Sequence, residues 1–330
     1  RMSRLSEERT LMFRHNDVSD LENVLRKAMR KVKGNEHNLK PEGNVVDKWP
    51  QIIVVIESVY SMDGDIAPIE DILNLSKQCG ASVVVDEAHG LGVYGRGNRM
   101  DMILPEKQSD LGFVGKGIRT GKGANSVGGG TGVLAALELE GHPALLCSIH
   151  TFGKAAGCHG AVIAASETLI DFLVNYARPF VYSTALPPHS LVAITCAYDS
   201  MTGLDGGERR TLVFGLVRLF RRKMIELLKL KSSSINSVLL PSPSPIQAVL
   251  VPGNNRCIAL SNRLKSEGNF QLYPIRSPTV PKGEERIRII LHSHNTEDEV
   301  RLLVNMLAAS IKSFGLVPGN TDSGSIISKL

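Results

Sequence analysis

The chain has 330 residues, of which 42% are hydrophobic and 22% charged, with a net charge of +5, a composition typical of a globular protein. Its basic residues are dispersed, which argues against nucleic acid as a partner. No apolar run reaches the ~20 residues that a membrane span needs, and we expect no signal peptide. The five cysteines are scattered and form no CxxC pair, so the sequence predicts neither a metal site nor a disulfide framework.

The first regular elements form a strand–helix–strand pattern. Residues 52–56 and 82–85 are short apolar runs rich in β-branched side chains, which is typical of buried parallel strands. Between them, residues 68–78 have a helical pattern, with proline in the first turn and Gly80 beyond the end. This order predicts a parallel sheet with helices on both faces.

The middle of the chain begins with a long glycine-rich segment. Residues 100–130 show little periodicity, and a loop of this length is uncommon inside a compact domain, so we expect a disordered insertion there. Regular patterns resume after it. They predict strands at residues 145–149, 161–165 and 180–183 and helices at residues 167–177 and from Pro188 toward Met201.

A second unit is predicted to begin near Leu204. It opens with an amphipathic helix over residues 208–230, whose basic side chains Arg218, Arg221, Arg222 and Lys223 we expect to face solvent. The domains predicted are a large one over residues 1–203 and a small α+β one over 204–316. Within the small domain, the patterns predict strands at residues 246–251, 270–273 and 286–291 and helices at residues 256–267 and 297–313.

The C-terminus is predicted to be a flexible tail over residues 317–330, rich in glycine, asparagine and serine. It ends in Ser328, Lys329 and Leu330. At a free C-terminus this tripeptide is the address that the peroxisomal import receptor reads. We therefore expect a peroxisomal location, with the cytoplasm as the alternative.

Asp86 ends the second predicted strand and begins the string Asp-Glu-Ala-His-Gly-Leu-Gly. The carboxyl ends of parallel strands are where such sheets place ligands. An acid there suits a cofactor ring whose nitrogen stays protonated, and His89 would lie near the same ring. A lone aspartate at a strand end more often caps the next turn. A helicase interpretation of the letters D-E-A-H needs a phosphate loop, which the sequence lacks.

Lys154 lies in the run Thr-Phe-Gly-Lys-Ala-Ala-Gly, directly after a predicted strand. Small neighbours let a cofactor aldehyde approach the amine, and partial burial beside His150 and His159 would lower its pKa enough for attack. Thr151 could donate its hydroxyl to a phosphate. A lysine in a loop is usually a solvated surface residue, but the apolar strand before Lys154 and the small residues around it argue against simple exposure.

Two further groups suit a cofactor and an amino-acid substrate. Ser61, in the string Ser-Met-Asp-Gly-Asp, could bind a ring oxygen, although Asp-Gly also predicts an ordinary turn. Arg286 and Arg288 alternate along a predicted strand and so share one face. Arginine binds carboxylates through two parallel hydrogen bonds. Two solvent-facing arginines are an equally good interpretation.

Together these residues resemble the α-oxoamine synthase family of pyridoxal 5′-phosphate (PLP) enzymes. The resemblance covers nearly the whole chain outside residues 100–130. Its motifs are SMDG at 61–64, DEAHGLGVYG at 86–95, TFGKAAGCHG at 151–160, YSTALPP at 182–188 and RSPTVP at 276–281. Asp65, Ala88 and Phe152 favour the biotin-pathway branch of the family.

The resemblance implies an α/β fold of PLP-dependent fold type I, with a mostly parallel sheet between helices and a smaller α+β C-terminal domain. It implies a homodimer that condenses L-alanine with pimeloyl-CoA, an acyl-CoA, to 8-amino-7-oxononanoate, CoA and carbon dioxide. Alternatives are a relative acting on glycine or serine with another acyl-CoA, and an inactive fragment or non-catalytic subunit. Family members also have a further N-terminal segment, which we expect to be missing here.

The resemblance also assigns roles to single residues. Lys154 and His89 are the predicted catalytic residues, and Lys154 carries PLP as a Schiff base. The predicted PLP contacts are Asp86 at the ring nitrogen, Ser61 and His89 at the ring oxygen, Thr151 at the phosphate, and Ser183 or Thr184 at the phosphate held by the partner subunit. The predicted substrate contacts are Arg288 at the alanine carboxylate and Thr279, with Arg276, in the pocket wall.

Overall fold

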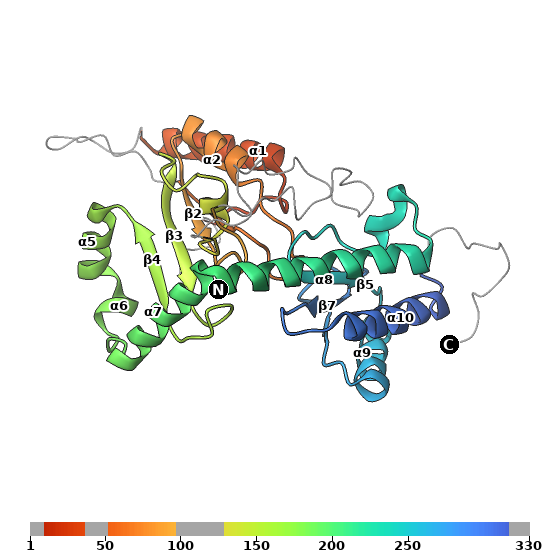
Figure 1. The fold of residues 1–330 in the computed structure, drawn as a ribbon. Coiled ribbons are helices and arrows are strands. Elements are labelled where there is room, and N and C mark those ends of the chain that lie inside the picture. The colour runs from red at the N-terminus through yellow and green to blue at the C-terminus, as the bar shows by residue number, and fades with distance from the viewer. Residues whose placement is uncertain (1–9, 37–51, 97–128, 317–330) are drawn as a thin grey trace, which may run out of the picture. The chain divides into compact units, whose positions relative to one another are not determined.

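The computed structural model describes residues 10–36, 52–96 and 129–316 (Figure 1). The predicted tail lies outside these residues, and so does nearly all of the predicted insertion. The described residues fall into two compact units. The first holds 10–36, 52–58, 67–96 and 131–199, and the second holds 59–66, 129–130 and 200–316. None of the described helices is long and apolar enough to cross a membrane.

The first unit is built on a four-stranded sheet in the order β1-β2-β3-β4. The first three strands are parallel and β4 is antiparallel to β3. Their bounds are β1 Ile53–Glu57, β2 Ser82–Asp86, β3 Leu145–Thr151 and β4 Ala161–Ala165. The parallel strands β1, β2 and β3 therefore end on one edge of the sheet, where Ser58, Asp86 and Thr151 lie.

Two helices pack on one another beside this sheet. In α2 (Ile69–Gln78), Ile69, Ile72 and Leu73 form a buried stripe at helical spacing, and the helix packs against β2 and α1 (Val18–Glu36). Burying each such side chain contributes about 1.5–3 kcal/mol. The strand β1 has one buried and one exposed face, because Val54 and Ile56 are buried whereas Ile53 and Val55 are each 48% exposed.

After β4 the first unit continues as helices with exposed apolar side chains. They are α5 (Glu167–Tyr176), α6 (Arg178–Val181) and α7 (Pro188–Thr202), and the last three residues of α7 belong to the second unit. The strand predicted at residues 180–183 is wrong, because Pro179 fits the first turn of a helix and the Ser183 hydroxyl closes that turn on the Pro179 carbonyl oxygen. Among the described residues, α5 buries no side chain and α7 buries only Met201.

The second unit combines a three-stranded antiparallel sheet, in the order β5-β7-β6, with helices (Figure 1). The long helix α8 packs against α10, which also packs against α9. The bounds are α8 Leu204–Leu228, the 3-10 helix η3 Ser232–Ser237, β5 Ile246–Leu250, α9 Asn254–Gly268, β6 Tyr273–Ile275, β7 Arg286–Ile290 and α10 Glu297–Ser313.

Two predictions in this unit need correction. The strand predicted at residues 270–273 begins only at Tyr273, because Asn269 adopts a left-handed conformation and Phe270 N–H donates to Leu264 O, which ends α9. Arg221, predicted to face solvent, is 0% exposed. Its guanidinium donates to Leu240 O and Gln247 Oε1, both 2.9 Å away, and burial lowers the pKa of Arg221.

Candidate functional site

The predicted acid Asp86 is half-buried at the end of β2, on the edge where β1 and β3 also end. Its Oδ1 accepts a hydrogen bond from Ala88 N–H at 2.8 Å, so the turn-capping interpretation is correct for this oxygen. Within the described residues no hydrogen bond engages Oδ2. Asp86 can therefore cap its turn and still offer one carboxylate oxygen to a ligand.

The turn after Asp86 places His89 at the same strand end. The turn closes through Gly90 N–H and Leu91 N–H, which both donate to Glu87 O at 2.9 Å. His89 is half-buried, while Ala88 and Leu91 around it are buried. Asp86 and His89 thus lie at the two ends of one turn, while the predicted contact of His89 with the cofactor ring stays a prediction.

Sequence reasoning missed Glu87, whose carboxylate is fully buried between these two residues. It accepts hydrogen bonds from Ser58 and from the first residues of α4 (Val133–Ala136). Burial raises the pKa of Glu87 above its ordinary value, while the hydrogen bonds from Leu134, Ser58 and Val133 act in the opposite direction. In the sequence, the hint of a tightly packed side chain here is Gly90, which leaves room for the Glu87 carboxylate. The sequence pattern does not show that residues 133–134 lie next to Glu87 in the fold.

Lys154 lies in a compact loop that joins β3 to β4. Phe152 N–H donates to Gly160 O at 2.9 Å, and Cys158 N–H donates to Phe152 O at 2.8 Å. The Phe152 ring is buried and contacts Tyr198 edge to face, with centroids 6.0 Å apart. Lys154 itself is exposed, so the expectation that packing shields it is wrong for this chain. The buried Phe152 fixes the loop, while the lysine side chain stays accessible.

A hollow of about 460 Å³ opens beside Lys154 and is lined by Thr151, Gly153, Lys154, Cys158, His159 and Gly160. Thr151 Oγ1 is buried and has no hydrogen-bond partner among the described residues. A buried hydroxyl without a partner is costly. Its donor suits an anionic oxygen, so the loop fits a phosphate-bearing cofactor.

His150 and the segment that contains Ser183 complete the surroundings of this loop. His150 Nε2 shares a hydrogen bond of 2.9 Å with Ser148 Oγ, and burial lowers the pKa of His150 although Asp86 opposes this. Ser183 and Thr184 are exposed, and the Ser183 hydroxyl is used by its own turn. A Cβ at Gly160 would lie 3.0 Å from Leu186 Cδ1, so the segment after Thr184 contacts the lysine loop.

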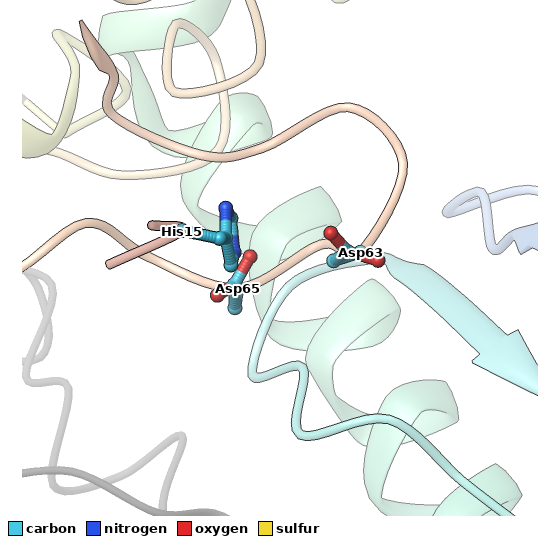
Figure 2. Close-up of side chains that lie close together, drawn as sticks. All are labelled: His15, Asp63 and Asp65. Atoms are coloured by element: carbon cyan, nitrogen blue, oxygen red, sulfur yellow. The ribbon is translucent and has the colours of Figure 1, made fainter. Parts of the chain in front are cut away.

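The remaining predicted residues belong to the second unit. Ser61 is half-buried in a turn over residues 59–66, where Gly64 N–H donates to Tyr60 O at 2.8 Å. Asp63 and Asp65 come from the same turn, with carboxylate oxygens within 4.8 Å of each other (Figure 2). Because Asp86 and His89 lie in the other unit, the shared ring contact of Ser61 and His89 stays a prediction.

Arg286 and Arg288, the two arginines of β7, differ in how deeply they are buried. Arg286 is 5% exposed, forms an ion pair with Asp63 and donates to Glu284 O at 2.9 Å. The interpretation of two solvent-facing arginines is therefore wrong for Arg286, which holds the turn over residues 59–66. Arg288 follows on the same face of β7 and is half-buried. Arg276 and Thr279 are exposed in one turn, in which Thr279 N–H donates to Arg276 O at 2.8 Å.

A parallel sheet with an acid after β2 and a lysine loop after β3, together with a smaller α+β unit, defines the class of PLP-dependent enzymes of fold type I. Solved structures support this fold. Serine palmitoyltransferase from S. paucimobilis, solved with bound PLP–myriocin, has a TM-score of 0.66 at 22% identity and covers 92% of this chain and 61% of that chain. 8-Amino-7-oxononanoate synthase from Francisella tularensis has a TM-score of 0.58 at 20% identity and covers 87% and 68%.

The chain belongs to the aminotransferase class I and II family, which matches residues 9–307. A curated relative, 8-amino-7-oxononanoate synthase from Cupriavidus necator, is 34% identical over 259 residues, which are 78% of this chain and 54% of the relative. The resemblance to α-oxoamine synthases is thus confirmed. The chain spans about half the length of this curated relative.

Proposed function

We propose that this chain is the PLP-binding part of an α-oxoamine synthase that condenses L-alanine with pimeloyl-CoA to 8-amino-7-oxononanoate, CoA and carbon dioxide. The observation that carries the proposal is the pairing of Asp86 and the Lys154 loop at the ends of adjacent parallel strands. The 34% identity to 8-amino-7-oxononanoate synthase supports this choice of substrates.

The cofactor, when bound, withdraws electrons from the substrate's α-carbon. Lys154 would hold the cofactor and carry the proton of that carbon. The Asp86 carboxylate would keep the ring nitrogen protonated, and Thr151 Oγ1 would donate to the phosphate. His89 and Ser61 would bind the ring oxygen, and Ser183 or Thr184 would reach the phosphate in the partner subunit.

The substrate residues would come from the second unit. Arg288 would hold the alanine carboxylate through two parallel hydrogen bonds, and Arg276 and Thr279 would line the pocket. Arg286 already forms an ion pair with Asp63, so the substrate role is assigned to Arg288, as in the resemblance to α-oxoamine synthases. Arg288→Lys should therefore weaken alanine binding more than cofactor binding.

A titration of the purified chain with PLP tests the cofactor assignment. We expect a visible absorbance band that Lys154→Ala removes and His159→Ala retains, since His159 lines the same hollow without a role in cofactor attachment. A wild-type chain that binds no PLP would contradict the assignment. The substrate assignment is tested by CoA release with alanine and pimeloyl-CoA, against glycine or serine with other acyl-CoAs.

A second candidate is a cofactor-binding chain without turnover of its own. The exposure of the Lys154 side chain favours it. It predicts a visible band with PLP but no CoA release with any substrate pair. CoA release by the purified chain would exclude it.

We also propose that the protein is a homodimer in peroxisomes. Exposed apolar side chains on α5 and α6 support an association surface; they include Phe172, Tyr176 and Phe180. The C-terminal tripeptide supports the peroxisomal address. Light scattering of the purified protein tests the dimer. A fluorescent fusion with and without residues 328–330 tests the location, and an unchanged diffuse signal would contradict it.

A further inference from the structure

Glu87 is fully buried directly beside Asp86, and none of the roles above uses it. Its carboxylate receives hydrogen bonds from side-chain and backbone donors on separate segments of the first unit. The donors are Ser58 Oγ at 2.7 Å, Val133 N–H at 3.0 Å and Leu134 N–H at 2.7 Å. One side chain therefore joins the end of β1, the end of β2 and the start of α4.

The Glu87 carboxylate also packs closely against two glycines, Gly90 and Gly132. A Cβ at Gly90 would lie 2.0 Å from Glu87 Oε2, and one at Gly132 would lie 2.9 Å from Glu87 Cδ. The Glu87 backbone N–H donates to Ile149 O on β3 at 2.8 Å. Hydrogen bonds and close packing therefore fix both the side chain and the backbone of Glu87 in one position.

The position of Glu87 bears on the direction in which the neighbouring Asp86 carboxylate points. Among the residues that the structure describes, the Asp86 side chain is held by one hydrogen bond, from Ala88 N–H, and Ala88 lies in the turn that begins at Glu87. The direction of Asp86 Oδ2 therefore depends on how that turn is oriented at the strand end. Burying a carboxylate is costly, and donors from several segments offset this cost only when the turn has one orientation.

We propose that Glu87 is a positioning residue for the cofactor: it ties the end of β2 to Ser58 and to the start of α4, and thereby aims the Asp86 carboxylate at the pyridine nitrogen of PLP. This inference rests on the proposed function, because it takes Asp86 as the partner of that nitrogen. Glu87 acts through Asp86 and does not touch the cofactor.

The test compares three variants of the full chain. Glu87→Gln keeps the size of the side chain but places an NH₂ group where an oxygen accepts hydrogen bonds. Ser58→Ala removes one donor and is the milder change. Ser76→Ala is the control, because Ser76 is buried on α2 in the same unit and its Oγ has no partner among the described residues. The readouts are the PLP dissociation constant, the bound cofactor's absorbance maximum and its pH dependence, and hydrogen exchange at Val133 and Leu134.

Glu87→Gln is expected to raise the PLP dissociation constant about tenfold, the effect of one misaligned charge-assisted hydrogen bond. It should also shift the absorbance band and speed exchange at Val133 and Leu134. Ser58→Ala should act in the same directions with a smaller effect, and it decides the matter if Glu87→Gln does not fold. Ser76→Ala should change none of these readouts.

Two different results would overturn the proposals. If a Glu87→Gln or Ser58→Ala variant exchanges faster at Val133 and Leu134 yet binds PLP with the wild-type constant and band, Glu87 is structural only. If the wild-type chain itself binds no PLP, the proposed function is wrong and this inference falls with it.

Discussion

Removing the hydroxyl of Thr151 tests the role of one residue. The change is expected to stabilise the cofactor-free protein and to weaken PLP binding. Thr151→Val removes a buried oxygen that has no partner among the described residues, so the cofactor-free protein should gain up to about 1 kcal/mol of unfolding free energy. PLP binding should weaken about tenfold, because the phosphate loses a donor.

Denaturant unfolding without PLP and a PLP titration check these two effects. Thr195→Val on α7 is the matched control, since Thr195 is exposed and its hydroxyl donates to Leu191 O at 3.1 Å. The control should leave PLP binding unchanged. Equal PLP binding by wild type and Thr151→Val would contradict the phosphate contact.

His150 predicts a pH dependence of stability. Burial lowers the pKa of His150 in the folded protein, so the unfolded chain binds the proton more readily. The stabilising contribution is present above the unfolded pKa of about 6.5 and is lost as the pH falls toward the folded value. His150→Gln should therefore lose less unfolding free energy than wild type between about pH 7.5 and about pH 5.5.

Urea unfolding of the cofactor-free chain at both pH values measures this difference. The control variant is His159→Gln, which removes an exposed imidazole from the neighbouring loop. An identical loss in wild type and His150→Gln would show that His150 does not cause the acid sensitivity.

At the scale of elements, sequence signals worked where they were local. The helix predicted at residues 297–313 is α10, because Thr296 and Glu299 form a capping box at its start. The apolar residues 180–183 are too few to show a period, so their helical start at Arg178 was missed. Asp86 and Lys154 could be proposed from the sequence because one ends a readable strand and the other follows one, whereas the backbone partners of Glu87 lie 46 and 47 residues away.

The turn over residues 59–66 gives a test of one element. Gly64 and Gly80 both have positive φ, +76° and +65°, but a Cβ at Gly64 would lie 2.1 Å from Ile246 O whereas Gly80 has nothing within 4 Å. Gly80→Ala should cost only the left-handed conformation, about 1–2 kcal/mol. Gly64→Ala should cost clearly more, because backbone must shift. Denaturant midpoints of the two variants check this order, and equal midpoints would contradict it.

At the scale of the whole molecule, the exposed apolar side chains of α5 and α6 predict a surface that binds hydrophobic dye. Phe172 and Tyr176 stack with ring centroids 4.9 Å apart and are 55% and 70% exposed. Phe172→Ser with Tyr176→Ser should reduce dye fluorescence and self-association, while stability changes within about 0.5 kcal/mol per substitution. A large loss of stability, measured by thermal unfolding, would contradict this.

The fold class was predictable because strand, helix and strand follow one another with clear apolar runs. The solvent exposure of charged residues was harder to predict from the sequence, as Arg221 shows. Its partners Leu240 and Gln247 lie 19 and 26 residues further on, beyond the reach of a helical pattern. Arg286, held by Asp63 across 223 residues, is a second case.

The 223 residues between Asp63 and Arg286 also matter for folding during synthesis on the ribosome. The turn over residues 59–66 leaves the ribosome early, but its partners Ser242 and Arg286 follow 178 and 223 residues later. Synthesis at about 5–20 residues per second leaves this turn without its docking surface for at least about ten seconds. The turn therefore stays undocked after β1 and β2, which flank it in the sequence, have been synthesised. A chain halted before residue 242 cannot place Ser61 in its final setting.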